Sequence, residues 1–264
     1  MIYTVGRSVK GASHIREDKP CQDFHIIEQS QNYTILTVAD GHGSSSCPYS
    51  QDGSKIASQV FRDLLSTYYS NYQNNLHELM SFLNRDGKIF IPKEIEHEWK
   101  NRVVSFNEQH DRNTEDLTKE SIYRQYGSTL LGVLITADFV YAFQLGDGDI
   151  VCIDENSISH IVETEQLLGV ETYSISNPDS WKYANCTIFP LSKYNVPNLY
   201  MLSTDGMINS HVSQNDFYIT CRDYYNLFNE NKSEYISNNL EDWLNETSKE
   251  GCDDDITVTF AFIT

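Results

Sequence analysis

The sequence is poor in positive charge and contains no long apolar run. Its 264 residues include 19 Lys and Arg against 38 Asp and Glu, which gives a formal net charge of −19. An acidic chain repels phosphate groups, so nucleic acid and anionic membrane surfaces are unfavourable as its main partners. No stretch is apolar over the length that spans a bilayer, and the first residues, MIYTVGRSVKG, lack the apolar core of a signal peptide. We therefore expect a cytoplasmic protein without membrane attachment.

Cysteine is scattered through the chain without a CxxC pair. The six cysteines therefore do not predict a zinc site. In a chain of this size without a secretory signal, we expect free thiols instead of disulfides. Internal repeats, low-complexity segments and linkers are also missing, while 39% of the residues are hydrophobic. These features predict one globular α/β domain over residues 1–264.

The stretch YTILTVADGHGSSS, residues 33–46, is the centre of the chain's pattern. Its first seven residues are apolar and β-branched, which predicts a buried strand. The strand ends before Asp40, and Gly41 and His42 follow at once. A carboxylate, an accessible glycine carbonyl and an imidazole together favour a hard cation and hydrolytic chemistry. An Asp-Gly turn between two strands is the alternative, and for a single occurrence it is the more common meaning.

Aspartate recurs at the ends of other predicted strands. Asp205 follows the apolar run NLYML, Asp147 and Asp149 follow another, acids precede the last strand in CDDDITV, and Asp23 begins a strand. Mg²⁺ and Mn²⁺ prefer several carboxylate oxygens together with water. A fold that gathers these strand ends at one edge would make a metal cluster. A solvated turn is the better interpretation for four other acids: Asp52, Asp86, Asp138 and Asp154.

Six short motifs follow one another along nearly the whole chain. They are CQD at 21–23, ADGHGSS at 39–45, GSTL at 127–130, LGDGDI at 145–150, STDGM at 203–207 and DDIT at 254–257. In this order and at these intervals they resemble the metal-dependent protein phosphatases of the protein phosphatase 2C family. The stretches SHIREDKPCQD and ETYSISNPDSW are similar to a compact bacterial branch of that family.

The resemblance implies a specific α+β fold. It is a four-layer α-β-β-α sandwich in which two central antiparallel sheets are flanked by antiparallel helix pairs, with a variable flap-like region at about 163–195. The patterns agree with helices at 51–72, 93–110 and 233–249, with strands between 126 and 162, and with a closing strand at 256–263. Ser213 and Asp216 form a capping box before a further helix. Residues 113–125 are expected to be a polar connection, and tight hairpins are expected at Asp138 and at 146–149.

The activity that the resemblance implies is hydrolysis of phosphoserine and phosphothreonine in proteins by attack of a metal-bound water or hydroxide. Two Mn²⁺ or Mg²⁺ ions are expected, or three if Asp147 and Asp205 hold a further one. Asp40 would bridge the two main ions. The implied metal residues, in chain order, are Asp23, Asp40, the carbonyl of Gly41, Asp147, Asp205 and Asp254.

The same resemblance implies roles for two further residues. His42 would protonate the leaving alkoxide as a general acid. An arginine before the first metal aspartate would clamp the substrate phosphate, and Arg16 is the nearest match, although His14 and Arg7 compete for that role. The chain departs from the family at Gln22, where many members have an acid, and at Asp255, which takes the place of the usual asparagine.

Two other classes of function stay open at the level of the sequence. A catalytically weak pseudophosphatase would act as a regulatory module that binds phosphoproteins, and a third possibility is a hydrolase of small phosphomonoesters. The intact aspartates argue against the pseudophosphatase. For the phosphatase we expect a phosphoprotein substrate, a cognate serine/threonine protein kinase in a signalling pair, and a monomeric chain.

Overall fold

The computed structural model describes residues 1–110, 112, 117–162, 172–191, 197–230 and 232–264. Its strands are β1 (Ile2–Val9), β2 (Phe24–Gln29), β3 (Tyr33–Ala39), β4 (Leu130–Thr136), β5 (Phe139–Leu145), β6 (Asp149–Ile153), β7 (Ile158–His160), β8 (Asn185–Pro190), β9 (Asn198–Ser203) and β10 (Ile256–Ile263). Its α-helices are α1 (Ala12–Arg16), α2 (Ser50–Tyr72), α3 (Leu76–Phe82), α4 (Lys88–Gln109), α5 (Lys119–Arg124), α6 (Asp205–Asn209), α7 (Gln214–Asn229) and α8 (Ser233–Glu250). A π-helical segment, Leu83–Gly87, and a 3₁₀ turn, Ser180–Lys182, complete the list.

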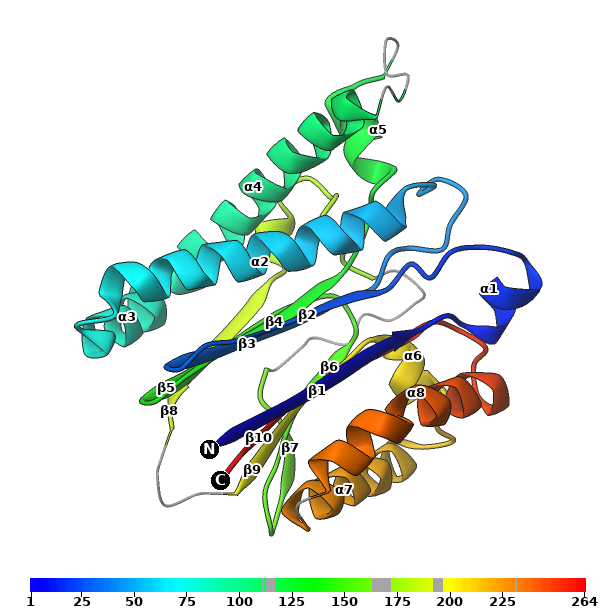
Figure 1. Ribbon diagram of the computed structural model, residues 1–264. Coiled ribbons are helices and arrows are strands. Elements are labelled where there is room, and N and C mark those ends of the chain that lie inside the picture. Colours follow the sequence, from blue (N-terminus) through cyan, green and yellow to red (C-terminus); the bar gives the residue numbers. More distant parts are fainter. Residues whose placement is uncertain (111, 113–116, 163–171, 192–196, 231) are drawn as a thin grey trace.

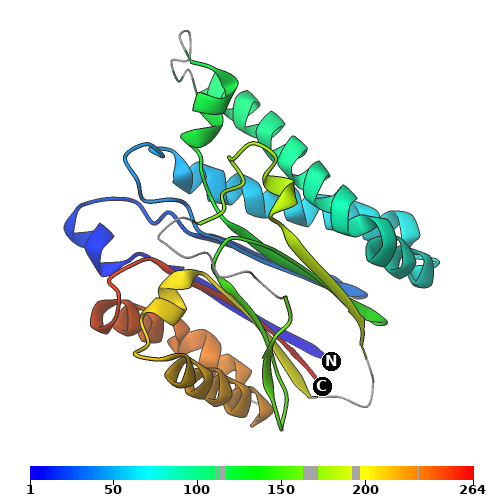
Figure 2. The same cartoon turned by 180° about the vertical axis from the view of Figure 1, so that it is seen from behind.

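The strands form two antiparallel sheets. Sheet A has the order β1-β10-β9-β6-β7, and sheet B has the order β2-β3-β4-β5-β8. Figure 1 shows α2, α3 and α4 over sheet B and the pair α7 and α8 under sheet A, and Figure 2 shows the same layers from behind. The predicted α-β-β-α sandwich is therefore confirmed. The two chain ends lie side by side at one end of the sheets, where the amino group of Met1 donates to the carbonyl of Thr264 at 2.8 Å.

Three apolar layers hold the sandwich together, because strand side chains alternate between the two faces of a sheet. In β4, Leu134 packs under the α2–α4 helices, whereas Val133 and Ile135 point between the sheets. In β10, Phe260 packs against α7 and α8, whereas Ala261 faces the other sheet. Strands that are buried on both faces read as nearly continuous apolar runs, which is the pattern of the sequence.

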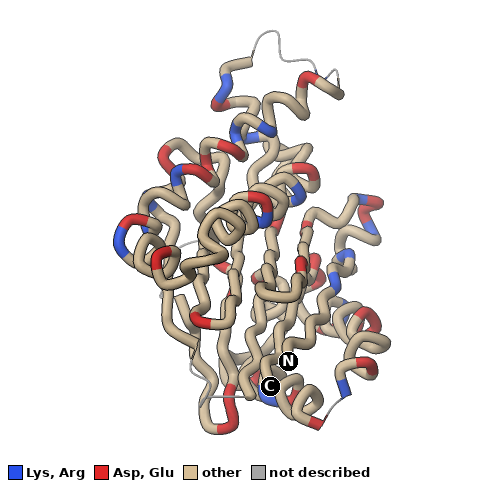
Figure 3. The backbone as a smooth tube through the Cα atoms, turned by 60° about the vertical axis from the view of Figure 1, so that its left-hand side comes forward, with Lys and Arg blue, Asp and Glu red and all other residues tan. Residues whose placement is uncertain are grey.

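Charge is concentrated outside these layers. Figure 3 shows acidic and basic residues along the helices and near strand ends, whereas the middle of the sheets carries few. Within the described residues, no helix combines the length and the apolar character that crossing a bilayer requires. All six cysteines are free thiols, as predicted.

Helix boundaries were predicted well except around residues 74–125. The second helix begins at Lys88 and not at 93, and it contains Pro92. Its inward residues Ile91, Ile95 and Trp99 are buried, so packing against the rest of the layer overrides the proline as a local breaker. The polar connection expected at 113–125 contains α5, which Thr118 caps by accepting a hydrogen bond from the Ser121 N–H. The prediction missed this helix because its composition is almost wholly polar.

The hairpin predicted at 146–149 is wrong. Strand β5 belongs to sheet B and β6 to sheet A, so the turn between them crosses from one sheet to the other. Gly146 makes this crossing with φ of +114°, a backbone conformation that side chains with a Cβ rarely adopt. The hairpin predicted at Asp138 is confirmed, because β4 and β5 pair directly across it.

The flap-like region predicted at 163–195 is described only in part. Residues 163–171 and 192–196 lie outside the described residues. Between them, the chain turns through Ser180–Lys182 and forms β8, which pairs with β5 at the edge of sheet B. The short strand expected near Cys186 is therefore confirmed. Ser213 also caps α7 as predicted, since its hydroxyl accepts the Asp216 N–H at 3.2 Å.

Candidate metal centre

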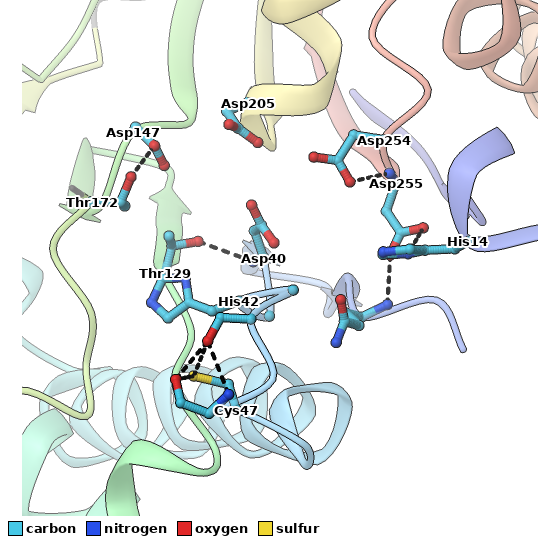
Figure 4. Close-up of a pocket in the computed structure, with 15 residues that line it drawn as sticks. His14, Asp40, His42, Cys47, Thr129, Asp147, Thr172, Asp205, Asp254 and Asp255 are labelled. Carbon is cyan, nitrogen blue, oxygen red and sulfur yellow. Dashed lines mark hydrogen bonds and ion pairs between the residues drawn. The ribbon is translucent and has the colours of Figure 1, made fainter. Parts of the chain in front are cut away.

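A polar cavity of about 840 Å³ lies at the end of the sandwich opposite the chain termini. Its walls come from segments that are far apart in the sequence but meet at the strand ends. In Figure 4, Asp40, Asp147, Asp205 and Asp254 surround one opening, with His42 and Cys47 to one side and His14 to the other. The full lining is His14, Gln22, Asp40, Gly41, His42, Gly43, Ser44, Ser46, Cys47, Thr129, Asp147, Thr172, Asp205, Asp254 and Asp255.

Asp40 is held at the end of β3 by the segment that begins β4. Its N–H donates to the hydroxyl of Thr129 at 3.0 Å, and the Thr129 N–H donates back to the Asp40 carbonyl at 2.8 Å. Gly41 continues this pairing as an isolated bridge with Ser128. The GSTL motif therefore fixes the DGH motif, so that the Asp40 carboxylate is presented by two rigid strands.

His42 lies against a glycine that leaves room for its ring. The His42 N–H donates to the Gly127 carbonyl at 3.1 Å. A Cβ atom at Gly127 would lie 2.7 Å from Cδ2 of His42, too close for the ring to keep its place. Burial lowers the pKa of His42, and the negative charge of Asp147 opposes that shift. The ring therefore belongs to the cavity and is not a solvated turn histidine.

Three other predicted metal residues reach the same cavity from different strand ends. Asp205 is the first residue of α6 after β9, and its carboxylate accepts from the Asn209 amide at 2.9 Å. Asp147 lies in the crossing between the sheets and accepts a hydrogen bond from the hydroxyl of Thr172. Asp254 immediately precedes β10 and accepts the N–H of Asp255 at 2.8 Å.

Asp23 lies behind the cavity wall. The residue is 5% exposed, and its carboxylate accepts the Thr204 hydroxyl at 2.7 Å. It does not line the cavity, yet its charge acts on Asp40. The structure therefore brings all five predicted aspartates and Gly41 into or directly behind one site.

Burial and mutual repulsion raise the pKa values of these carboxyl groups. Burial and then the charges of Asp23, Asp205 and Asp254 raise the pKa of Asp40 well above its usual range. Burial and the charge of Asp147 raise the pKa of Asp205 to about 6. Burial also raises the pKa of Asp254. Gathering like charges in this way is unfavourable unless a cation compensates them.

The donor set fits a hard divalent cation, because carboxylate oxygens and a glycine carbonyl are the ligands that Mg²⁺ and Mn²⁺ select. The side chains are arrayed around the cavity and do not converge on one point. Among the residues that the structure describes, no three His, Cys, Asp or Glu side chains lie close enough to hold one ion together. The fit therefore rests on donor chemistry and on the shared cavity.

The three candidates for a phosphate clamp lie in different places. Arg16 is on the surface and donates to both carboxylate oxygens of Asp253, at 3.2 and 2.9 Å. Arg7 lies in β1 with its nearest acid, Glu241, at 3.8 Å. Of the three, only His14 lines the cavity. The role predicted for Arg16 stays a prediction, with the side chain outside the cavity wall in this arrangement.

Several lining residues were not singled out from the sequence. Thr172 lies in the region predicted to be flap-like, and no sequence signal connects it with Asp147. Cys47 is buried beside the serines that follow the DGHG turn. Gln22 and Asp255 had a signal, because each departs from the residue that the family usually has at its position.

Together, the two-sheet sandwich and the carboxylate cavity define a candidate hydrolase built around divalent cations. The chain belongs to the protein phosphatase 2C family, since the profile described as "Protein phosphatase 2C" matches residues 10–245. The family predicted from the motifs is thereby confirmed, and it places the chain among phosphoprotein phosphatases, which are hydrolases. No curated protein matches the sequence.

Solved structures, serine/threonine phosphatases among them, share the fold. The S. agalactiae serine/threonine phosphatase is 14% identical with a TM-score of 0.58, over 100% of both chains. The catalytic domain of the serine/threonine phosphatase PstP, in complex with two manganese ions, is 12% identical with a TM-score of 0.54, over 99% of this chain and 97% of that one. RsbX in complex with magnesium is 15% identical with a TM-score of 0.53, over 100% and 96%.

Proposed function

We propose that this chain hydrolyses phosphoserine and phosphothreonine in proteins with the help of Mn²⁺ or Mg²⁺. The observation that carries the proposal is the single cavity in which Asp40, Asp205, Asp254 and His42 meet. Membership of the protein phosphatase 2C family supports it. The manganese and magnesium complexes of PstP and RsbX support the choice of cations.

The residues proposed to hold the ions are those at the strand ends. Asp40 would bridge two ions, Asp23 and the Gly41 carbonyl would serve one of them, and Asp205 and Asp254 the other. A third, weaker ion would use Asp147 together with Asp205. When bound, such cations lower the pKa of water and neutralise charge on a phosphoryl group.

His42 is proposed as the general acid for the leaving oxygen. Its backbone N–H donates to the Gly127 carbonyl, and its ring lies close to the same glycine at the cavity wall. A proton donor matters most when the leaving group is a serine or threonine alkoxide, because that group is strongly basic. A positioned acid of this kind contributes on the order of 10²–10⁴-fold to the rate.

The test is turnover of a phosphoserine peptide and of para-nitrophenyl phosphate, each with Mn²⁺ and with excess chelator. The proposal expects Mn²⁺-dependent release of phosphate from both, abolished by the chelator, with the higher kcat/KM on the peptide. Turnover of the small ester alone would indicate a small phosphomonoester hydrolase. No turnover at any Mn²⁺ concentration, in protein shown to be folded, would favour a phosphoprotein-binding module. A cognate kinase, a monomeric state and a cytoplasmic location stay predictions.

A further inference from the structure

The described residues that line the cavity include no arginine or lysine to receive an anionic substrate. Among the described residues that line it, the ionisable side chains are five aspartates, Cys47 and the two histidines His14 and His42. A phosphoryl dianion that entered this cavity would have oxygens that the proposed cations do not contact, and these oxygens would need another partner. Of the two histidines, His42 is already assigned to the leaving group. His14 is left without a function in the proposed reaction.

His14 is a buried residue of the cavity wall, and a hydrogen bond holds its ring. Its side chain comes from α1 and is buried, with the residue 8% exposed. Its Nδ1 lies 2.9 Å from Oδ1 of Asp255, which is itself 4% exposed. In Figure 4 the ring lies beside Asp255 and extends toward the opening bounded by Asp40 and Asp254. Within the described part of the chain, no group hydrogen-bonds to Nε2 of His14.

Asp255 is fixed independently of the histidine. Its Oδ1 accepts the Gly11 N–H and its Oδ2 accepts the Gln22 N–H, both at 2.6 Å. A carboxylate only accepts, so the His14 nitrogen that faces it, Nδ1, carries the hydrogen. The other nitrogen, Nε2, is then the one available to the cavity. In the protonated ring both N–H groups have a direction: Nδ1 toward Asp255 and Nε2 toward a ligand.

We propose that His14, oriented by Asp255, contacts the phosphoryl group of the substrate and takes the place of an arginine clamp in this chain. The proposal rests on the phosphatase function proposed above. It gives a function to one departure from the family pattern, because the aspartate at 255 holds the His14 ring through Nδ1. Arg16 has its two-pronged contact with Asp253 instead, at the surface.

Two substitutions of His14 distinguish a contact with the substrate phosphate from a purely structural role. In His14→Asn the amide nitrogen can replace Nδ1 at Asp255, while nothing replaces Nε2. In His14→Gln the longer amide can reach the position of Nε2. With a phosphoserine peptide at saturating Mn²⁺, His14→Asn should raise KM roughly 10- to 100-fold, as expected for a lost hydrogen bond to a charged group, with a smaller fall in kcat. His14→Gln should recover part of the loss.

The control is His97→Gln, because His97 is an exposed histidine on α4 whose ring faces Asn101. Its KM should equal that of the wild type. Arg16→Gln measures the rival clamp. A wild-type KM in His14→Asn, or a raised KM in Arg16→Gln alone, would overturn the assignment of His14. Equal thermal unfolding of all variants confirms that KM is not changed by misfolding.

Binding of inorganic phosphate keeps the inference testable apart from turnover. Calorimetric titration of phosphate into the Mn²⁺-loaded wild type and His14→Asn should show the same 10- to 100-fold difference in Kd. If the wild type lacks turnover but shows that difference, the proposed function fails and the phosphate contact stands. If the two proteins bind phosphate equally, or the wild type binds none, the inference about His14 is wrong whatever the turnover.

Discussion

The middle of the sandwich and the end that holds the carboxylate cavity, here called the site end, differ in the kind of residue that they bury. Between the sheets, residues such as Val133, Ile135 and Ala261 are buried and apolar, so each adds to the stability of the fold. At the site end, Asp23, Asp40 and Asp205 gather like charges whose raised pKa values report repulsion and burial. The comparison teaches that the fold is stabilised in one region and that the chemistry is placed in another, where local stability is sacrificed.

The largest effect is expected at Asp40. Asp40→Asn removes the proposed bridging charge, so kcat/KM for a phosphoserine peptide should fall on the order of 10³-fold or more. In the metal-free protein the same change relieves repulsion, so the free energy of unfolding should rise by about 1 kcal/mol. Kinetics with the peptide measure the fall in kcat/KM, and chemical denaturation in the presence of chelator measures the rise in the free energy of unfolding. Near-normal turnover would contradict the assignment of Asp40.

The next effect concerns His42 and depends on the leaving group. His42→Ala should slow turnover of a phosphoserine peptide on the order of 10²-fold or more, because the alkoxide then leaves without a proton. Para-nitrophenyl phosphate should lose much less, since its leaving group needs little protonation. Steady-state kinetics on both substrates decides the point. An equal loss on both would assign His42 to positioning of water or metal instead.

In the middle of the sandwich the outcome should reverse. Ile135 is fully buried between the sheets, and Ile135→Ala should lower the free energy of unfolding by about 2–5 kcal/mol. Ile135→Val, the matched smaller change, should cost about 0.5–1.5 kcal/mol. Below the unfolding temperature, kcat of both variants should stay at the wild-type value. A large fall in kcat of the folded Ile135→Val protein would break the separation between the two regions.

The smallest effect is a dependence of metal affinity on pH. A carboxyl group must lose its proton to bind a cation, and the pKa of Asp205 is raised to about 6. Mn²⁺ affinity should therefore be nearly constant above pH 7 and fall as the pH drops through 6, by roughly tenfold per unit for each proton displaced. Calorimetric titrations of Mn²⁺ between pH 5 and 8 measure this. A constant affinity across that range would show that no raised carboxyl group takes part in binding.

The strands and helices of the sandwich could largely be predicted from the sequence, and so could the aspartates that lie in clear motifs. Apolar runs and helical spacing predicted β3, β10, α2 and α8 close to their observed bounds, because the periodicity of apolar residues can be read from the chain alone. The DGH, LGDGDI, STDG and DDIT motifs contain the aspartates that line the cavity. Contacts between side chains far apart along the chain could not be predicted. Asp255 and His14, which are in contact, are 241 residues apart.

The failures have physical reasons of the same kind. Gly146 sits in a turn that looks like a hairpin, but only the partners of β5 and β6 show that the chain changes sheets there. A proline usually ends a helix, yet Pro92 lies inside α4, where tertiary packing keeps the helix continuous. The phosphate clamp predicted at Arg16 is not one of these failures and stays a prediction, although His14, and not Arg16, lines the cavity.

The most direct test of a cation centre at the site end is calorimetric titration of Mn²⁺ into the chelator-treated wild type and Asp40→Asn at pH 7.5. The wild type should bind two ions, and a third more weakly. Asp40→Asn should lose at least one of the two or bind both much more weakly, because the residue proposed to be shared by the ions is changed. Equal stoichiometry and affinity in the two proteins, or no binding by the wild type, would contradict the account.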